Sequence, residues 1–319
     1  MTRLGERAGL VGLAAFVAVD VLLVGIAVNS TRKPVADGGQ QIGSSTVGTS
    51  SGGASNRPTT PATTTTTGSA DASQPDVKVA PLTVGIVGID QKTAFRFTVG
   101  SCRDGGAKLE LTRNAGASWG PRTARFDTLV RVRVRDDGSA FSVGANASSD
   151  CTPAIRQASK FDADWGDAAA VNNAWYRDPR DERSVGLSTG GTDKPCGTKA
   201  VVDLAVVDRG AAALCADGTV LVSKTGASWD QTASVPGALA LALDDKSRSV
   251  AVVPGADGCA GLTVVDAAKP DAALGCVQTD LAKVKPGTVA LSVTGSGGWL
   301  RVGGAVFRAG TGLATWKQA

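Results

Sequence analysis

The chain of 319 residues has no histidine, and it has only three glutamates, one tyrosine and one methionine. Histidine is the side chain that most often acts as a general base near neutral pH and as a metal ligand. Its absence excludes Ser-His-Asp and Cys-His catalysis and His-ligated zinc or haem. Acid–base chemistry would have to come almost entirely from aspartate, and we expect neither a metal nor a cofactor.

Strong charge of either sign is also lacking. The chain has 33 Lys and Arg against 29 Asp and Glu, which gives a net charge of +4. It contains no dense cluster of Lys and Arg of the kind that follows nucleic-acid phosphates. Nucleic acid is therefore not an expected partner.

One long apolar run lies near the N-terminus. Residues 8–28 contain a single charge, Asp20, and as a helix they would span about 30 Å, the thickness of the hydrocarbon core of a bilayer. No small-residue cleavage site follows, so we predict an uncleaved transmembrane anchor, with a cleaved signal peptide as the alternative. Asp20 either contacts another helix or is simply tolerated, and the second interpretation is the simpler. Residues 1–7 are then the cytoplasmic N-terminus.

Residues 29–75 are rich in Ser, Thr, Gly and Pro and include an unbroken run of threonine at positions 63–67. They have too few apolar side chains to offset the entropy of ordering. We predict a disordered linker with a mean reach of about 35–42 Å. Stalks of this composition are typical of extracytoplasmic proteins, which places residues 76–319 outside the cytoplasm.

Residues 76–319 contain a repeated pattern of three short strands and a Gly-containing turn, which ends in Trp in four of five copies. The first strands of the copies begin near residues 82, 129, 201, 239 and 289. Alternation with period two, Gly and Asp turns and the lack of a helical period predict an all-β domain. Five copies give about 49 residues per unit, as in a four-stranded propeller blade. We predict a β-propeller of about five blades, with six as the open alternative.

The last copy ends at Trp316 with three residues to spare. This predicts that the last blade lacks its own outer strand. Residues 76–80 would supply that strand and close the ring, which would also remove an exposed sheet edge.

One turn resembles the Asp-box repeat. Residues 112–119 read TRNAGASW and are similar to the pattern Ser/Thr-x-Asp-x-Gly-x-Ser/Thr-Trp of BNR-type propellers, known from sialidase-type, sortilin-type and photosystem-assembly-type proteins. The resemblance implies a hairpin between the third and fourth strands, a side chain that caps turn N–H groups, a glycine with positive φ and a Trp between blades. A second copy has Lys224 at the Asp position. The matching residues are Thr112, Asn114, Gly116 and Trp119 in the first copy, and Gly226 and Trp229 in the second.

The six cysteines lie beyond the linker, and their even number fits disulfides in an oxidising compartment. Two pairs bracket neighbouring strands, and the third pair occupies equivalent turns of adjacent copies. A zinc site is the alternative, which the lack of C-x-x-C and of histidine disfavours. The predicted bridges are Cys102–Cys151, Cys196–Cys215 and Cys259–Cys276.

Because the resemblance includes sialidases, the sequence is compared with the residues that glycan hydrolysis would require. The resemblance to sialidases would imply three arginines that bind the carboxylate of the substrate. It would also imply a Tyr nucleophile activated by a Glu, and an Asp that acts as the acid. Residues 76–319 have one tyrosine, Tyr176, and two glutamates, and no Phe-Arg-Ile-Pro segment. A pair of aspartates would suffice for other hydrolases, but nothing selects a pair. We therefore assign no catalytic residue.

The longest gap between copies follows Trp165, and residues 175–183 are its most distinctive part. They combine the only tyrosine with a tryptophan and three arginines, the residue types that dominate binding hot spots. In the alternative interpretation, the tryptophan is buried between blades and the charges form a solvated loop. The candidate binding residues are Trp175, Tyr176, Arg177, Arg180 and Arg183.

Arg131, Arg133 and Arg135 alternate with valines on one predicted strand. Such a strand has one basic face, which either lines a channel or binds an anion. Alternatively the arginines stack against acidic or aromatic groups of the next blade, which is the simpler interpretation.

Together these patterns predict a single-pass membrane protein that is held by residues 8–28 and presents residues 76–319 outside the cytoplasm. We expect this propeller to be a non-enzymatic binding or scaffolding module of the cell envelope with a protein or glycan ligand. The alternative is an extracellular glycoside hydrolase of sialidase-like fold.

Overall fold

The computed structural model describes residues 77–208, 210–256 and 258–319. The predicted cytoplasmic N-terminus, the anchor with Asp20 and the linker lie outside the described residues. None of the helices within these ranges has the length and apolar character needed to cross a bilayer.

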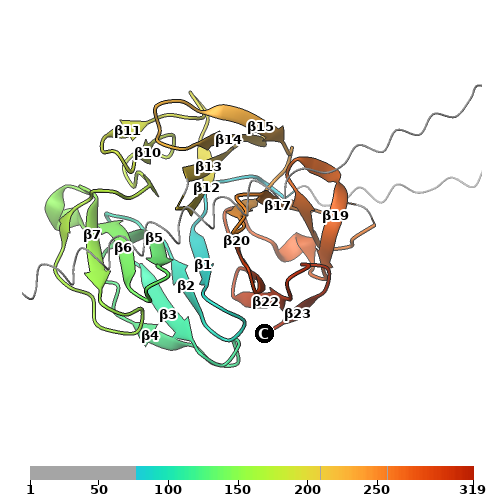
Figure 1. The fold of residues 1–319 in the computed structure, drawn as a ribbon, viewed down its shortest axis with the longest axis horizontal. Helices are drawn as coiled ribbons and strands as arrows, with labels where there is room; N and C mark the ends of the chain where they lie inside the picture. The colour runs from blue at the N-terminus through green and yellow to red at the C-terminus, as the bar shows by residue number, and fades with distance from the viewer. Residues whose placement is uncertain (1–76, 209, 257) are drawn as a thin grey trace, which may run out of the picture. The chain divides into compact units, whose positions relative to one another are not determined.

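The described residues form 23 strands in six sheets, which are the blades of a β-propeller (Figure 1). Within each blade the strands follow one another in sequence order and pair antiparallel. The first strand of each blade faces the axis of the ring. Two short 3-10 helices, η1 (Ala147–Ser149) and η2 (Leu281–Lys283), lie in connecting loops.

Each blade occupies one continuous stretch of the chain. Blade 1 consists of β1 (Val84–Gly88), β2 (Ala94–Thr98), β3 (Lys108–Thr112) and β4 (Gly120–Arg122). Blade 2 consists of β5 (Thr128–Val134), β6 (Ala140–Ala145), β7 (Ala154–Ala158) and β8 (Ala169–Ala170). Blade 3 consists of β9 (Tyr176–Arg177), β10 (Val185–Gly186) and β11 (Thr192–Asp193).

The second half of the ring is built in the same way. Blade 4 consists of β12 (Val201–Val207), β13 (Gly210–Cys215), β14 (Thr219–Ser223) and β15 (Asp230–Ser234). Blade 5 consists of β16 (Ala240–Leu243), β17 (Ser249–Pro254), β18 (Leu262–Asp266) and β19 (Lys269–Val277). Blade 6 consists of β20 (Val289–Thr294), β21 (Gly297–Val302), β22 (Ala305–Ala309) and β23 (Trp316–Gln318).

The all-β propeller is thus confirmed, and the ring has six blades. The sixth is blade 3, which lies in the long gap after Trp165. Its three strands have two residues each, so they carry no alternating pattern. Segment 175–183 is therefore part of a blade rather than a loop between blades.

The predicted closure of the ring by residues 76–80 is wrong. Strand β23 is the outer strand of blade 6 and pairs with β22, and residues 77–82 are in no strand. An outer strand of three residues is enough to complete a blade, as β4 shows in blade 1.

Blades 1 and 6 close the ring by side-chain packing. Trp299 of β21 is fully buried and meets Trp119 edge to face, with ring centroids 6.4 Å apart. Its indole N–H donates to the carbonyl of Asp90 at 2.8 Å. A Cβ at Gly88 would lie 2.4 Å from the Trp299 ring, so glycine is required for this close approach. These contacts hold the ring closed without a shared sheet.

The two turns that resemble Asp boxes connect third and fourth strands. In the first, the Asn114 side chain accepts the N–H of Ser118 at 3.0 Å, and Thr112 Oγ1 accepts the N–H of Gly116, whose φ is +89°. In the second, Ser223 Oγ accepts the N–H of Gly226 at 2.8 Å. The side chains thus satisfy turn N–H groups, as the resemblance implies.

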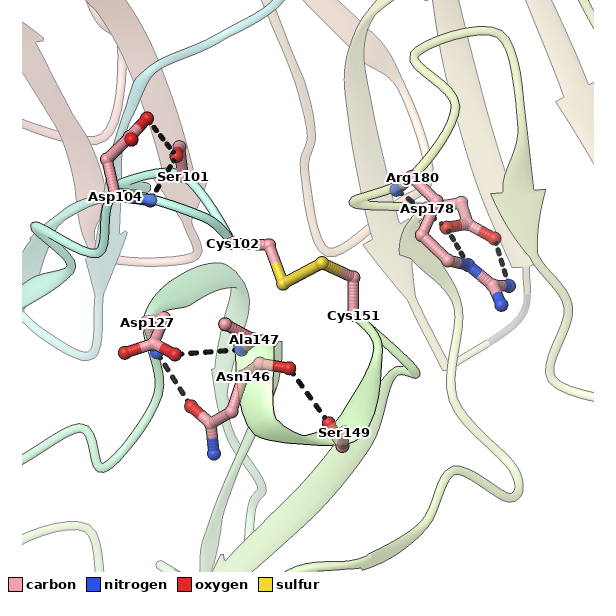
Figure 2. The surroundings of a disulfide bond; sticks show 10 residues. All are labelled: Ser101, Cys102, Asp104, Asp127, Asn146, Ala147, Ser149, Cys151, Asp178 and Arg180. Carbon is pink, nitrogen blue, oxygen red and sulfur yellow. Dashed lines mark hydrogen bonds and ion pairs between the residues drawn. A yellow bond between two sulfur atoms is a disulfide. The ribbon is translucent and has the colours of Figure 1, made fainter.

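Three disulfides join the predicted cysteine pairs, Cys102–Cys151, Cys196–Cys215 and Cys259–Cys276. The first links the loop after β2 to the loop before β7, and so ties blade 1 to blade 2 (Figure 2). The other two join parts of the chain only 19 and 17 residues apart. Three disulfides in one domain indicate an oxidising environment.

Candidate functional site

A cavity of about 790 Å³ lies on the axis of the ring, where residues from the first strand of every blade line it. Blade 3 differs from the others: the hairpin after β9 lies beside the beginning of β12, where the carbonyl of Glu182 accepts the N–H of Val201. The first strands of the other five blades run in the same direction, because β1 lies beside β20 and β12 beside β16 with equivalent ends adjacent. The cavity therefore has one end at the beginnings of these strands and another at the hairpins that follow them.

The chain itself closes the end where the first strands begin. Leu82 is buried there, and its N–H donates to the carbonyl of Val202 in β12 at 3.0 Å, across the ring from blade 1. The Arg177 guanidinium donates to the carbonyl of Leu82 at 2.6 Å. Val77 belongs to the hydrophobic cluster that contains Leu281 and Val284 of the loop before β20, at the same end. We call this the closed end, and residues 77–83 the arm.

The opposite end is formed by the hairpins after the first strands, and we call it the mouth. Several of its lining residues are exposed, whereas those at the closed end are buried or half-buried. Hairpins of blades 2, 4, 5 and 6 contribute to it. The exposed residues that line the mouth are Arg135, Asp136, Asp208, Asp245, Ser247 and Gly295.

One wall of the cavity is basic, because Arg131 and Arg133 of β5 and Arg135, which directly follows it, all line the cavity. We call these three residues the β5 arginine row. The guanidinium carbons of Arg131 and Arg135 lie 5.1 and 4.9 Å from the centre of the Phe141 ring in β6, which they flank. Arg133 forms an ion pair with Asp208, at the end of β12. The arginines therefore line a channel and also stack on an aromatic ring, which belongs to their own blade rather than to the next one.

Burial, together with repulsion from Arg133 and Arg135, lowers the pKa of Arg131 to about 9. Its guanidinium still carries its charge at neutral pH, and it donates to the carbonyl of Trp175. Arg131 thus contributes a positive charge to the basic wall.

A half-buried acid lies near the closed end. Asp203 of β12 accepts the N–H groups of Leu204 at 2.8 Å and Leu241 at 2.9 Å. Burial raises the pKa of Asp203 to about 6, although these two hydrogen bonds and the charge of Arg177 oppose the rise. Burial also lowers the pKa of Arg177. Asp203 is therefore a carboxyl group inside the cavity whose pKa lies near 6.

Five aspartates line the cavity, and two of the others, Asp244 and Asp208, already have partners. Asp244 is buried and accepts the N–H groups of Lys246 at 3.0 Å and Arg248 at 2.7 Å, and it forms an ion pair with the Arg248 side chain. Asp208 is paired with Arg133. These groups shape the hairpins, and neither is left as an unengaged acid or base.

The structure separates the predicted binding residues of segment 175–183. Tyr176 and Arg177 line the cavity. Trp175 is buried, and its ring meets that of Trp229 edge to face at 5.6 Å, between blades 3 and 4. Arg180 and Arg183 are exposed on the loop between β9 and β10, outside the cavity.

The two exposed arginines are paired within their own loop. Arg180 makes a two-pronged contact with the buried Asp178 at 2.8 and 3.0 Å (Figure 2). Arg183 pairs with Asp181, which Lys194 also contacts at 3.0 Å, and the hydrogen bonds from both cations hold the pKa of Asp181 well below its usual range. These pairs stabilise the loop and leave fewer donors for a ligand.

Sequence reasoning identified the basic strand and Arg177 but not Asp203, Asp208 or the arm. The signal for Asp203 is a single charge within the apolar strand VVDLAVV. Asp208 follows the same strand directly, at the hairpin.

No family model matches the chain, and no curated protein matches it. Among solved structures it is similar to YCF48 bound to a D1 peptide, with 17% identity and a TM-score of 0.37 over 76% of this chain and 82% of that one. It is also similar to PorZ, a surface component of the type-IX secretion system of Porphyromonas gingivalis, with 13% identity and a TM-score of 0.39 over 76% of this chain and 33% of that one.

A GH74 xyloglucanase from Xanthomonas campestris is a third similar structure, with 13% identity and a TM-score of 0.30 over 73% of this chain and 38% of that one. These proteins differ in function, and the similarity to each of them concerns the fold.

Proposed function

We propose that this protein is a membrane-anchored, extracytoplasmic β-propeller of Asp-box type that acts as a non-enzymatic binding module for an envelope protein or glycan. Residues 8–28 hold it in the membrane, and residues 29–75 form the linker. The ligand binds at the mouth of the central cavity. The observation that carries this proposal is a cavity with one open end, where basic and acidic side chains from different blades come together.

The place where the chain enters the ring supports this assignment. Val77, the first described residue, belongs to the hydrophobic cluster that contains Leu281 and Val284 of the loop before β20, at the closed end. The arm therefore lies on the face opposite the mouth and does not cover it. Tyr176 and Arg177 support the cavity from within, whereas the loop with Arg180 and Arg183 is a separate candidate surface near the closed end.

Position-specific photocrosslinking of the full-length protein in its native envelope tests this proposal. The crosslinker is placed at Asp245, which is exposed at the mouth, or at Lys283, which is equally accessible at the closed end. A third variant carries it at Arg180. We expect a discrete adduct from position 245 alone. Adducts only from position 283 or 180, or from no position, would overturn binding at the mouth.

Trp175→Ala is not a clean test of binding, because this side chain is 4% exposed and packs against Trp229. Its loss would damage the interface between blades 3 and 4. Exposed positions avoid this difficulty.

One observation favours a second function, that of a glycoside hydrolase. Asp203 lies in the cavity, and its raised pKa is the property of a general acid. If this interpretation holds, the full-length protein releases reducing sugars from envelope glycan, and Asp203→Asn abolishes the release while the fold is retained. Equal product from the wild type and the variant, or none from either, favours the binding module.

A further inference from the structure

The basic wall is uncovered because blade 3 is short. Strand β9 has two residues, whereas β5 and β12 on either side have seven each. At about 3.3 Å per residue, β9 reaches less than a third of the length of its neighbours. The part of β5 nearest the mouth therefore has no first strand beside it, and its arginine side chains face a gap between blades 2 and 4.

The arginine heads in this gap are held in place. Phe141 lies opposite Arg133 in the β5–β6 pairing, and its ring is flanked by the guanidinium groups of Arg131 and Arg135. Arg131 is also fixed by its bond to the carbonyl of Trp175. An anion that enters the gap thus meets guanidinium groups that need little reorganisation.

Asp208 occupies this gap from the other side. It belongs to blade 4, and its side chain is 76% exposed, whereas that of Arg133 is 23% exposed. An ion pair with so exposed a carboxylate is worth little, because water competes for it. The partly buried Arg133 nevertheless offers a planar fork that suits any carboxylate. Asp208 therefore stands where the carboxylate of a ligand would bind.

The acidic groups nearby do not cancel this preference. Asp244 is neutralised by Arg248 and by two backbone N–H groups of its hairpin. Asp203 lies near the closed end, beside Arg177. Asp136 and Asp245 are exposed at the mouth, so the preference for an anion rests on the local arrangement of the three arginines and not on the net charge of the cavity.

Part of the cavity wall beyond the arginines is aliphatic. Five half-buried apolar side chains from four blades line it, and they accept an apolar body rather than a sugar ring with its many hydroxyl groups. These side chains are Val87, Val130, Leu204, Val206 and Val293.

We propose that the β5 arginine row binds the carboxylate of a ligand with an aliphatic body, and that this carboxylate displaces Asp208 from Arg133. The proposal rests on the proposed function, because it names the chemistry that the mouth recognises. Such a ligand is either a small aliphatic acid or the carboxyl-terminal residue of a peptide.

Isothermal titration calorimetry on the full-length protein tests the site with N-acetyl-leucine and with its amide, N-acetyl-leucinamide. We expect binding of the acid and about tenfold weaker binding of the amide, which lacks the charge. 4-Methylpentanoate, which has the carboxylate and the aliphatic body but no peptide group, separates the two sources. Equal affinity for both acids indicates a small acid, and a preference for N-acetyl-leucine indicates a peptide end.

Two variants test the displacement step. Arg133→Gln should weaken the binding of N-acetyl-leucine by about tenfold, and Asp208→Asn should strengthen it severalfold, because the internal competitor is gone. Arg113→Gln is the matched control, since Arg113 pairs with Asp162 on the surface outside the cavity and its loss should leave the affinity unchanged.

Equal binding of acid and amide, no binding of either acid, or weaker binding by Asp208→Asn would overturn the carboxylate site. Such a result leaves the proposed function standing if the crosslinker at position 245 still forms its adduct. Loss of that adduct with intact binding of the acid would instead overturn the macromolecular partner and keep the site.

Discussion

Asp203 shows how a single charged residue can be both structural and titratable. Its carboxylate accepts an N–H from its own strand β12 and another from β16, so it ties blade 4 to blade 5 near the closed end. Burial raises its pKa to about 6, whereas in the unfolded chain an aspartate titrates near 4. The folded protein therefore takes up this proton more readily than the unfolded chain does.

Because the pKa of Asp203 is higher in the folded protein than in the unfolded chain, the free energy of unfolding depends on pH. Between about pH 4 and pH 6 the native state binds more protons than the unfolded state, so the contribution of Asp203 to stability falls as pH rises, by at most about 1.4 kcal/mol per pH unit. Asp203→Asn imitates the protonated form at every pH. Relative to the wild type, its free energy of unfolding should rise by roughly 2–3 kcal/mol from pH 4 to pH 7.

Urea unfolding of both proteins across this pH range measures the difference. Other carboxylates change the slope in both proteins alike, so only the difference between the two curves carries the signal. Parallel curves would show that Asp203 titrates normally in the folded state.

At the scale of residues, charge patterns were visible in the sequence but their partners were not. The alternation of Arg131, Arg133 and Arg135 predicted a basic face. That Phe141 and Asp208 would meet this face depends on the register of β5 with β6 and on the length of blade 3, and no local pattern encodes either. The disulfides were predictable, because Cys102 and Cys151 occupy equivalent turns of adjacent repeats and the other two pairs bracket neighbouring strands.

At the scale of elements, the short strands of blade 3 explain why five copies of the pattern were found rather than six. A strand of two residues has no period, and its pairing is set by neighbours rather than by its own sequence. Blade 3 is held by few contacts, and one of them is the packing of the Tyr176 ring on Gly186. A Cβ at position 186 would lie 2.0 Å from this ring, so glycine is required for the close approach.

The disulfides differ in the length of chain that they close, which gives a prediction. Cys102–Cys151 closes 49 residues and Cys259–Cys276 closes 17. If the main effect is on the entropy of the unfolded chain, the first contributes about 4 kcal/mol and the second about 3 kcal/mol. Replacing both cysteines of the first pair by alanine should therefore lower the free energy of unfolding by about 1 kcal/mol more.

Urea unfolding of the two double variants makes this comparison. The shorter bridge lies within blade 5, and its removal leaves the contact between blades intact. A larger loss from removal of Cys259–Cys276 would show that local packing, rather than loop length, decides the contribution.

At the scale of the whole molecule, the arm is the part of the described chain that crosses from blade 1 to blade 4. It buries Val77 and Leu82 and accepts the Arg177 guanidinium. A chain that begins at Val77 should unfold at the same temperature as the full-length protein in the same detergent. A chain that begins at Val84 should lose about 3 kcal/mol or more, because two apolar side chains and their hydrogen bonds are gone.

Thermal unfolding followed by circular dichroism distinguishes these cases. Equal melting of all three chains would show that the arm adds nothing to the ring. A large loss in the chain that begins at Val77 would mean that the domain extends into the preceding residues.

The fold class and the repeat were predictable at this scale, because period-two alternation and recurring Gly turns extend over most of the domain. The manner of closure was not. It depends on the packing of Trp299 against Trp119 and Gly88, which are far apart in the chain, and on an outer strand of three residues that no pattern marks.

The closed end also constrains the kinetics of any ligand in the cavity. Because the arm blocks one end, molecules enter and leave through the same opening. A competing ligand cannot enter the cavity through the closed end while another ligand is bound at the mouth, so exchange begins with dissociation of the bound ligand. The rate of replacement should then equal the dissociation rate and stay constant however high the competitor concentration becomes.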